Sequence, residues 1–289
     1  MDDQSDIWPE VDIARREHRY ELVLNGGIDC RIEKDGLDMT IFKLTNLNFL
    51  RISHTCLTIL PDDIGHLINL KNLLLDHNKL ISIPSTIGKL TKLKLLDLSY
   101  NNLDKLPDQM GQLLQLTDLN LICNQLTSLP TSIGNLQSLA RMNVSSNKLN
   151  QLPDQLYQAC NLGEFRAADN SINNVTDNIA SLCQLKTLDL NGNKMEVIPH
   201  QIALCSKLKE LTLMDNPIKD RKCIKLIKQN NSKLLIEYLR TINKKESVTK
   251  RPSQGKSVHI DHLLQYANPY HLDISEQQPW LLHIHKCRN

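Results

Sequence analysis

Apolar and polar positions alternate in this chain in a pattern that returns every 23 residues. The stretch LTDLNLICNQL at 116–126 has the form LxxLxLxxNxL, and the same form begins again at residues 70, 93, 139, 185 and 208 with conservative changes. One asparagine occupies the same place in each unit: Asn78, Asn101, Asn124, Asn147, Asn170, Asn193 and Asn216. A strict period of this length predicts a solenoid, in which each unit covers the apolar face of its neighbour.

The middle of each unit predicts a β-strand. Its xLxLx segment alternates with period two, so the leucines point inward and the residues between them point outward. Stacked units then build one parallel sheet. We therefore expect an α/β fold, a leucine-rich repeat solenoid with a parallel concave sheet, short helical or 3₁₀ turns on the convex side, and helical caps at both ends.

The second half of each unit carries a turn signature. Leu-Pro or Ile-Pro is followed by an apolar residue and glycine, as in LPTSIG at 129–134. Proline suits the first turn of a helix and cannot donate to a sheet ladder. These segments therefore predict short helical turns and not a second sheet.

The unit at 162–184 departs from this pattern. Phe165 and Ala167 replace the strand leucines, and Val175-Thr176 replaces Leu-Pro. We expect this unit to carry the main structural variation of the array, with a local change of curvature.

The repeated asparagine is predicted to be structural. Where the chain bends out of the sheet, backbone N–H and C=O groups face the interior, and each buried group left unpaired costs about 1–3 kcal/mol. An asparagine amide offers both donors and an acceptor. Asn124 and its six equivalents should therefore satisfy backbone groups in their own turn and in the next one. An amide presented to a ligand is the alternative.

Four segments follow from these patterns. Residues 1–46 are expected to form an N-terminal helical cap and a degenerate first repeat, and residues 47–218 hold the 23-residue repeats. Residues 219–242 carry apolar positions at helical spacing, which predicts a C-terminal helical cap. Residues 243–289 begin as a basic linker rich in helix breakers and continue as a tail that we expect to be disordered.

The composition of the chain says more about its cellular compartment than about any chemical activity. The net charge of +2, from 34 basic and 32 acidic residues, is too balanced to hold the protein on nucleic acid or membrane by bulk charge. The polar N-terminus lacks the apolar region of a secretory signal, and the 8 cysteines contain no CxxC pair. We expect free thiols in a cytoplasmic protein, with the nucleus as the alternative, and a monomer without a membrane span.

Catalytic signatures are missing from the sequence. It contains no GxxxxGK[ST], GxSxG or HExxH motif and no GxGxxG after a strand. A repeat array offers a broad surface and not an enclosed pocket, so we expect a non-catalytic protein without a cofactor. His283, His285 and Cys287 cluster in the tail but fall short of four well-spaced zinc ligands, so no metal site is predicted.

Outward strand positions are the candidate binding surface for a protein partner. One column lies between the two strand leucines, and a second, from His54 to Asp215, directly precedes the repeated asparagines. An exposed aromatic residue such as Tyr100 is a suitable anchor for a partner. The residues predicted to bind the partner are Arg51, His77, Asp97, Tyr100, Asn120, Asn143, Arg166 and Asp189. For each of them taken singly, a solvated polar position is the alternative.

The array resembles the intracellular 23-residue leucine-rich repeat proteins with the LPxxIGxL signature. The segments at 8–26, 165–172, 185–199 and 208–240, which begin WPEVDIARRE, FRAADNSI, LKTLDLNGN and LKELTLMDN, are similar to the family of leucine-rich repeat-containing protein forty-seven. The resemblance implies an intracellular protein. In that family the repeats precede a basic linker and a module similar to the editing module of the phenylalanyl-tRNA synthetase beta chain.

The same resemblance implies an alternative function in RNA association, linked to tRNA or translation. The tail after the linker does not match that module, so RNA would be bound by the cap and the linker. The bases concerned are Arg221, Lys222, Lys225, Lys228, Lys244, Lys245, Lys250 and Arg251. A truncated form of a protein with the second module is a further alternative, and a solvated helix face is the simplest interpretation of the bases.

Overall fold

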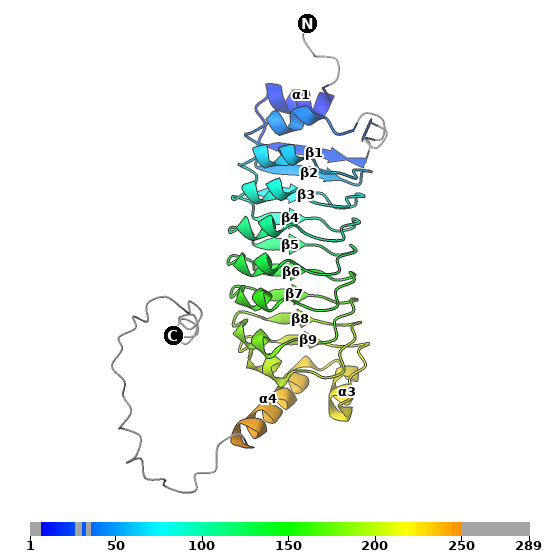
Figure 1. Ribbon diagram of the computed structural model, residues 1–289, viewed down its shortest axis with the longest axis vertical. Coiled ribbons are helices and arrows are strands. Elements are labelled where there is room, and N and C mark those ends of the chain that lie inside the picture. Colours follow the sequence, from blue (N-terminus) through cyan, green and yellow to red (C-terminus); the bar gives the residue numbers. More distant parts are fainter. Residues whose placement is uncertain (1–6, 27–30, 33–35, 250–289) are drawn as a thin grey trace, which may run out of the picture. The chain divides into compact units, whose positions relative to one another are not determined.

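The computed structural model describes residues 7–26, 31–32 and 36–249, and within them nine strands form one parallel sheet (Figure 1). The strands follow one another in chain order, without a crossover. They are β1 (Glu21–Asn25), β2 (Phe49–Ser53), β3 (Asn72–Leu74), β4 (Leu95–Asp97), β5 (Asp118–Asn120), β6 (Arg141–Asn143), β7 (Glu164–Arg166), β8 (Thr187–Asp189) and β9 (Glu210–Thr212). The predicted repeat solenoid is confirmed.

Each strand pairs with the next at a step of one repeat. Leu96 lies opposite Leu119, and the central strand residues are buried because their side chains point into the core. The irregular unit keeps this register: Phe165 lies between Met142 of β6 and Leu188 of β8. Phe165 and Ala167 are both fully buried, so one large and one small side chain replace the usual pair of leucines without breaking the strand pairing.

Short 3₁₀ turns form the side of the solenoid opposite the sheet, as predicted (Figure 1). They are η2 (Met39–Lys43), η3 (Asp62–His66), η4 (Ser85–Lys89), η5 (Asp108–Gln112), η6 (Thr131–Asn135), η7 (Asp154–Gln158), η8 (Asp177–Ser181) and η9 (His200–Leu204). Proline caps most of them, for example Pro130 with φ −65° at η6. The turns stack closely: a Cβ added to Gly134 would lie 2.1 Å from the carbonyl oxygen of Gln155 in the next turn. Only glycine fits there.

Helices lie at both ends of the described array. At the N-terminal end, α1 (Pro9–Arg16) starts with proline and buries Val11 and Ala14, and β1 pairs with β2 to open the sheet. At the other end, α3 (Arg221–Lys228) is capped by Asp220, whose carboxylate accepts hydrogen bonds from the backbone N–H groups of Lys222 and Cys223 at 2.7 and 2.8 Å. Both helical caps bury apolar residues against the repeats.

The last helix is longer than the sequence pattern indicated. We expected the cap to end at residue 242, but α4 runs Ser232–Thr249. No proline or glycine interrupts the chain before Pro252, so helix propensity carries the helix into the start of the predicted linker. The compact unit of the repeats ends at Asn243. Lys250, Arg251, His283, His285 and Cys287 lie outside the described residues.

No helix in the described ranges is both long and apolar enough to cross a membrane.

Thiol labelling should distinguish two buried cysteines from a half-buried one. Burial raises the pKa of Cys205 to about 11 and that of Cys223 to about 12, so neither forms the reactive thiolate at pH 8. Iodoacetamide at that pH should leave both unmodified in the native protein and should modify the half-buried Cys123. Peptide mass mapping measures this, with the urea-unfolded chain as the control in which all three react. Rapid native labelling of Cys223 would contradict the packing of α3.

Candidate binding surface on the concave face

The side of the sheet that faces away from the 3₁₀ turns, here called the concave face, carries the residues predicted to bind a partner. Pairing at one-repeat steps puts Arg51 beside Leu74 and Leu74 beside Asp97, and the column continues across the sheet. Its members are Arg51, Leu74, Asp97, Asn120, Asn143, Arg166, Asp189 and Thr212, all half-buried except the exposed Arg166. The structure therefore brings six of the predicted residues into one line, here called the strand column.

Members of the strand column hold one another in place. The amide of Asn120 donates to the Asp97 carboxylate at 3.2 Å, and the Thr212 hydroxyl donates to Asp189 at 2.7 Å. Each bond joins neighbouring repeats, so the side chains of one unit orient those of the next. A surface held in this way loses little side-chain entropy when it binds a partner.

A second column follows the strands in an unusual backbone conformation, and it contains the predicted His77 and Tyr100. Its members have positive φ values of 52–60°: His54, His77, Tyr100, Cys123, Ser146, Asp169, Gly192 and Asp215. The left-handed residue turns the chain so that the next residue, the repeated asparagine, enters the core. The backbone N–H of Tyr100 donates to Ile122 O of the next repeat at 2.8 Å, which holds this conformation in place. We call this line the turn column.

Three aromatic rings stack at the start of the turn column. The centroids of His54 and His77 are 4.2 Å apart with an interplanar angle of 18°, and His77 and Tyr100 are 4.2 Å apart at 15°. The stack follows directly from the repeat, because equivalent positions in neighbouring units are superposed along the sheet. Tyr100 ends the stack and is 46% exposed, which makes it an anchor that a partner can reach.

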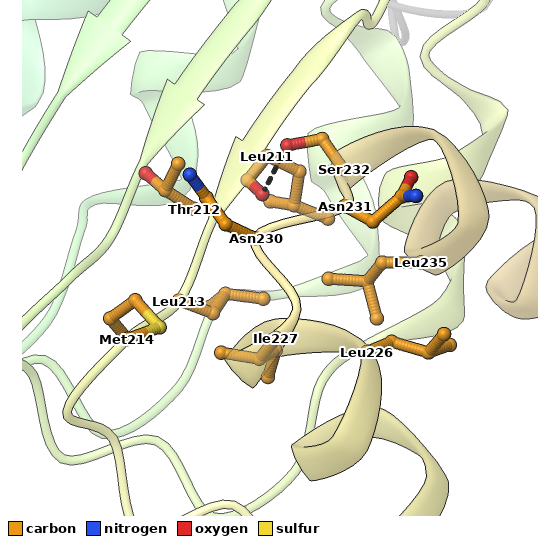
Figure 2. Close-up of a pocket in the computed structure, with 10 residues that line it drawn as sticks. All are labelled: Leu211, Thr212, Leu213, Met214, Leu226, Ile227, Asn230, Asn231, Ser232 and Leu235. Carbon is orange, nitrogen blue, oxygen red and sulfur yellow. Dashed lines mark hydrogen bonds between the residues drawn. The ribbon is translucent and has the colours of Figure 1, made fainter.

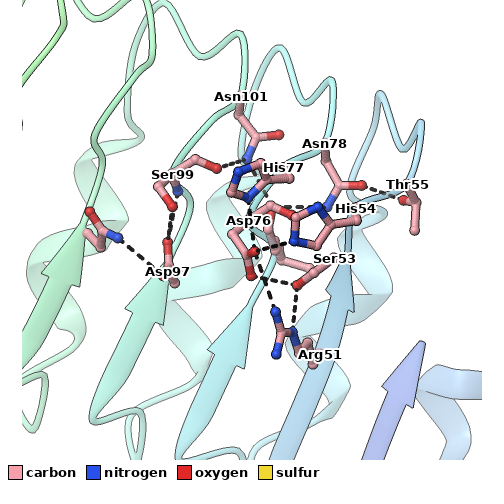
Figure 3. Close-up of polar contacts among 12 residues, drawn as sticks. Arg51, Ser53, His54, Thr55, Asp76, His77, Asn78, Asp97, Ser99 and Asn101 are labelled. Carbon is pink, nitrogen blue, oxygen red and sulfur yellow. Dashed lines mark hydrogen bonds and ion pairs between the residues drawn. The ribbon is translucent and has the colours of Figure 1, made fainter. Parts of the chain in front are cut away.

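Asp76 is a site residue that the sequence patterns missed. Its carboxylate accepts a hydrogen bond from the Ser53 hydroxyl at 2.5 Å and lies 3.1 Å from His77 Nδ1, while Arg51 and His54 are each 3.7 Å away (Figure 3). Burial opposes ionisation of Asp76, but the Ser53 and His77 hydrogen bonds and the Arg51 charge outweigh it, so its pKa lies below the usual value. The carboxylate is thus ionised and surrounded by cation-forming groups.

The sequence did contain a signal for Asp76. Its place in the repeat, between the two predicted columns, holds small or apolar side chains in other units, such as Ser99, Ile122 and Ala168. A carboxylate at a largely buried position of a repeat requires partners. Asp76 belongs to neither of the two predicted columns and was for that reason not among the predicted residues.

A shallow groove of about 250 Å³ crosses the concave face from β4 to β7. It is lined by Leu95, Leu96, Asp97, Asp118, Leu119, Asn120, Arg141, Met142, Asn143 and Glu164. Arg141 and Glu164 were not predicted, although period-two alternation places the residue before each central strand leucine on the same outward face as the strand column. Arg141 forms an ion pair with Asp118.

Carboxylates outnumber the arginines of these outward positions from β4 to the end of β9. The acids are Asp97, Asp118, Glu164, Asp169, Asp189, Glu210 and Asp215, and the arginines are Arg141 and Arg166. Arg166 Nε donates to Glu164 at 2.6 Å, and this bond, helped by the charges of Asp189 and Glu210, raises the pKa of Arg166. Because each arginine is already paired with an acid, this part of the concave face is acidic.

The repeated asparagines bond to the backbone of two repeats. Asn124 Nδ2 donates to Leu121 O of its own turn at 3.1 Å and to Leu98 O at 2.9 Å, and its Oδ1 accepts from Leu103 N at 3.0 Å. Leu98 and Leu103 belong to the preceding repeat, so the expectation that the second set of partners lies in the next turn is wrong. The side chain enters the core behind its own strand, where the carbonyls of the previous bend are nearest. Asn101 repeats the arrangement, whereas Asn78 donates to Ile52 O of the preceding repeat but accepts from the Thr55 hydroxyl with its Oδ1 (Figure 3).

The recess under the C-terminal cap is small. The space between β9, α3 and α4 has a volume of about 10 Å³, the size of one water molecule. Leu235 and Ile227 point toward the end of the last repeat, and the Ser232 hydroxyl donates to Leu211 O at 2.9 Å (Figure 2). The cap is therefore a packed cover and not a ligand pocket.

The lysines and arginines that were predicted to contact RNA and that the structure describes lie on the surface of α3 and α4. Arg221, Lys225 and Lys228 are exposed on α3, and Lys244 and Lys245 are exposed near the end of α4. Lys222 is also exposed, but its ammonium lies 4.2 Å from the centre of the Tyr238 ring, a cation–π contact that ties α3 to α4. RNA binding by Lys222 and the other bases stays a prediction.

Comparisons with known proteins agree with the fold. Residues 22–128 match the family described as "Leucine-rich repeat region". Among solved structures, a leucine-rich repeat protein of Leptospira interrogans is 33% identical, with a TM-score of 0.63, over 68% of this chain and 50% of that one. A plant peptide hormone receptor, RGFR1 in complex with RGF2, is 30% identical, with a TM-score of 0.57, over 62% and 30%.

Another similar structure is the functional domain of InlJ from Listeria monocytogenes, 23% identical with a TM-score of 0.56 over 70% of this chain and 40% of that one. At that identity the likeness concerns the fold alone. The chain thus spans half or less of the length of each of these three proteins. None of the curated proteins matches the chain in the sequence comparison.

Proposed function

We propose that this leucine-rich repeat solenoid is a non-catalytic scaffold that binds a protein partner on its concave face. The observation that carries the proposal is the open groove across β4–β7, lined by side chains that bond to one another from repeat to repeat. A shallow groove exposes its bound ligand to water and suits an extended chain, whereas enzymes need an enclosed site for a small substrate. The array offers such a surface over several repeats.

The chemistry of the groove favours a partner segment with basic side chains. Asp97 lies at one end of the groove and Glu164 at the other, and Arg141 between them is neutralised by Asp118. A lysine or arginine of the partner would find carboxylates already oriented, and opposite charges also speed association. Tyr100, at the exposed end of the ring stack, supplies an apolar contact beside them. One similar structure is that of a peptide hormone receptor in complex with RGF2, which supports peptide binding as a use of this architecture.

Combined substitution of Asp97, Tyr100 and Glu164 by alanine should lower partner affinity at least about tenfold, the loss of a typical hot-spot contact, without changing the melting temperature. All three side chains are half-buried or exposed, so little core packing is lost. Affinity purification with the full chain identifies proteins retained by the wild type, and titration of the purified partner gives the Kd. An acid and a base of the convex turns, Asp108→Ala with Lys89→Ala, serve as the matched control. Equal binding by the concave-face and control variants would reject the concave face as the site.

The same affinity purification also tests the alternative functions predicted from the sequence. If the chain is an RNA-associated protein similar to the leucine-rich repeat-containing protein forty-seven family, or a truncated form of one, nuclease treatment should release what it retains, and the concave variant should behave as wild type. The exposed Arg221, Lys225 and Lys228 on α3 support this second candidate. Steep loss of binding with salt would be expected for phosphate contacts.

A cytoplasmic location and a monomeric state belong to the proposal. The location is supported by the described cysteines, which form no disulfide with one another and are spread over separate repeats and the cap: Cys56, Cys123, Cys160, Cys183, Cys205 and Cys223. Reduced thiols suit a reducing compartment. Cell fractionation and light scattering of the purified chain test the two statements.

A further inference from the structure

Two histidines and one carboxylate from neighbouring repeats meet at the start of the turn column. His54 follows β2, and Asp76 and His77 follow β3. One possible ligand atom of each residue, a ring nitrogen of either histidine and a carboxylate oxygen of Asp76, lies within 4.8 Å of the other two. Two imidazoles with one carboxylate form a donor set that suits zinc and other late divalent transition metals.

The distances around Asp76 fit a metal site. Zinc binds imidazole nitrogen and carboxylate oxygen at about 2.0–2.2 Å, so two ligand atoms of a tetrahedral ion lie roughly 3.3–3.5 Å apart. The Asp76 oxygen is 3.1 Å from His77 Nδ1 and 3.7 Å from His54 Nε2, on either side of that value. Because the His54 side chain is 55% exposed, its ring can turn to bring the third pair of ligand atoms closer.

The three ligands are also held in position by groups behind them. The other Asp76 oxygen accepts the Ser53 hydroxyl, which leaves Oδ2 facing the histidines (Figure 3). Both histidines have left-handed φ values, 56° and 54°, which fix where each side chain starts, and the stacked rings of His54 and His77 would tilt apart for both nitrogens to face one ion. Groups that orient the ligands in this way are what gives a metal site its affinity.

The positive charge of Arg51 opposes binding of a cation at this site. Its guanidinium lies 3.7 Å from Asp76 Oδ2 and its Nε donates to Ser53 at 3.1 Å. An ion would have to displace this charge from the carboxylate. The Arg51 side chain is 35% exposed and lies on the open face of the sheet, so it can turn toward water while the Ser53 bond to Asp76 remains.

We propose that His54, Asp76 and His77 bind one divalent transition metal ion of the zinc class at the N-terminal end of the concave face. The ion would have three protein ligands and would keep at least one position open on the exposed side, because both histidines face solvent. This inference is independent of the partner proposed above, since it uses ligands outside the β4–β7 groove. The concave face would then bind a divalent cation of the zinc class in addition to a partner held by hydrogen bonds and charge.

Zinc titration of the full chain tests the site. Zn²⁺ is added in competition with a chromophoric chelator to the wild type and to His54→Asn, His77→Asn and Asp76→Asn. Asparagine is chosen for the histidines because it tolerates their positive φ. Each substitution should remove one bound Zn²⁺ per chain or weaken that site at least tenfold. Histidines and cysteines of the tail are present in every variant, so the difference from the wild type isolates the proposed site.

His66→Asn is the matched control. His66 is exposed and its Nδ1 lies 3.5 Å from Asp63, so it forms a histidine–carboxylate pair that lacks the second histidine. This variant should bind Zn²⁺ as the wild type does, and melting curves should confirm that all variants are folded. If the surface variants His54→Asn and His77→Asn keep the wild-type number of sites and affinity, the proposal is wrong. An equal loss in His66→Asn would also overturn it, because the binding would then not depend on the three-ligand geometry.

Discussion

Asn124→Ala should lower the free energy of unfolding by about 2 kcal/mol, although it removes only one small side chain. The backbone carbonyls that accept hydrogen bonds from the Asn124 amide also accept from other groups in the wild type, and those bonds remain in the variant. Leu98 O still accepts from the Asn101 amide, and Leu121 O still accepts from the Asn147 amide. The group that loses its bond is the backbone N–H of Leu103, which donates to Asn124 Oδ1 at 3.0 Å and lies in a fully buried residue. The cost is therefore that of one stranded donor together with the lost packing.

Urea unfolding monitored by circular dichroism measures this change, and Asn102→Ala is the control. Asn102 is exposed, and its side chain makes only a long contact, 3.4 Å, with Gln125, so its removal should change stability by less than about 0.5 kcal/mol. Hydrogen exchange should locate the loss at Leu103 and its neighbours in the preceding repeat. If the exchange instead increased only in the repeat after Asn124, the bonding direction given above would be wrong.

Much of the fold could be predicted because the repeat leaves few choices. A 23-residue period with alternating leucines defines the inward face of every strand, and the position of Pro130 or its equivalents defines where each 3₁₀ turn begins. The direction of the asparagine bonds could not be predicted in the same way. The equivalent positions of the repeats before and after Asn124 are both 23 residues away in the chain. Only the path of the folded backbone decides which of their carbonyl groups lie near the Asn124 side chain.

The candidate surface was predictable in part. Alternation identifies outward residues such as Asp97 and Arg166 one at a time, without showing which of them form ion pairs. The pattern within a single repeat does not show that His54, Asp76 and His77 come together. Their grouping depends on the stacking of rings that are 23 residues apart in the chain and on the burial of the Asp76 side chain. Searching for titratable residues one period apart, including positions beside the columns, would have found it.

Phe165→Ala should have the largest effect on stability, about 4 kcal/mol. Phe165 is the largest of the fully buried side chains, and it fills the space beside Ala167 that leucines fill in other repeats. Truncating it leaves a cavity that rigid neighbouring strands cannot close. In a solenoid, stability is carried by contacts between neighbouring units, so the loss should divide the array at β7 and broaden the unfolding transition.

The neighbouring alanine provides the decisive comparison. Phe165→Leu alone should cost about 1 kcal/mol and Ala167→Leu alone about 2 kcal/mol through overpacking. The double substitution restores the leucine pair of the regular repeats, as at Leu188 and Leu190, so it should cost less than the sum of the two by at least about 1 kcal/mol. Urea unfolding of the four proteins completes the double-mutant cycle. If the two effects simply added, the large residue would not be compensating for the small one, and the uninterrupted strand pairing of β6, β7 and β8 would need another cause.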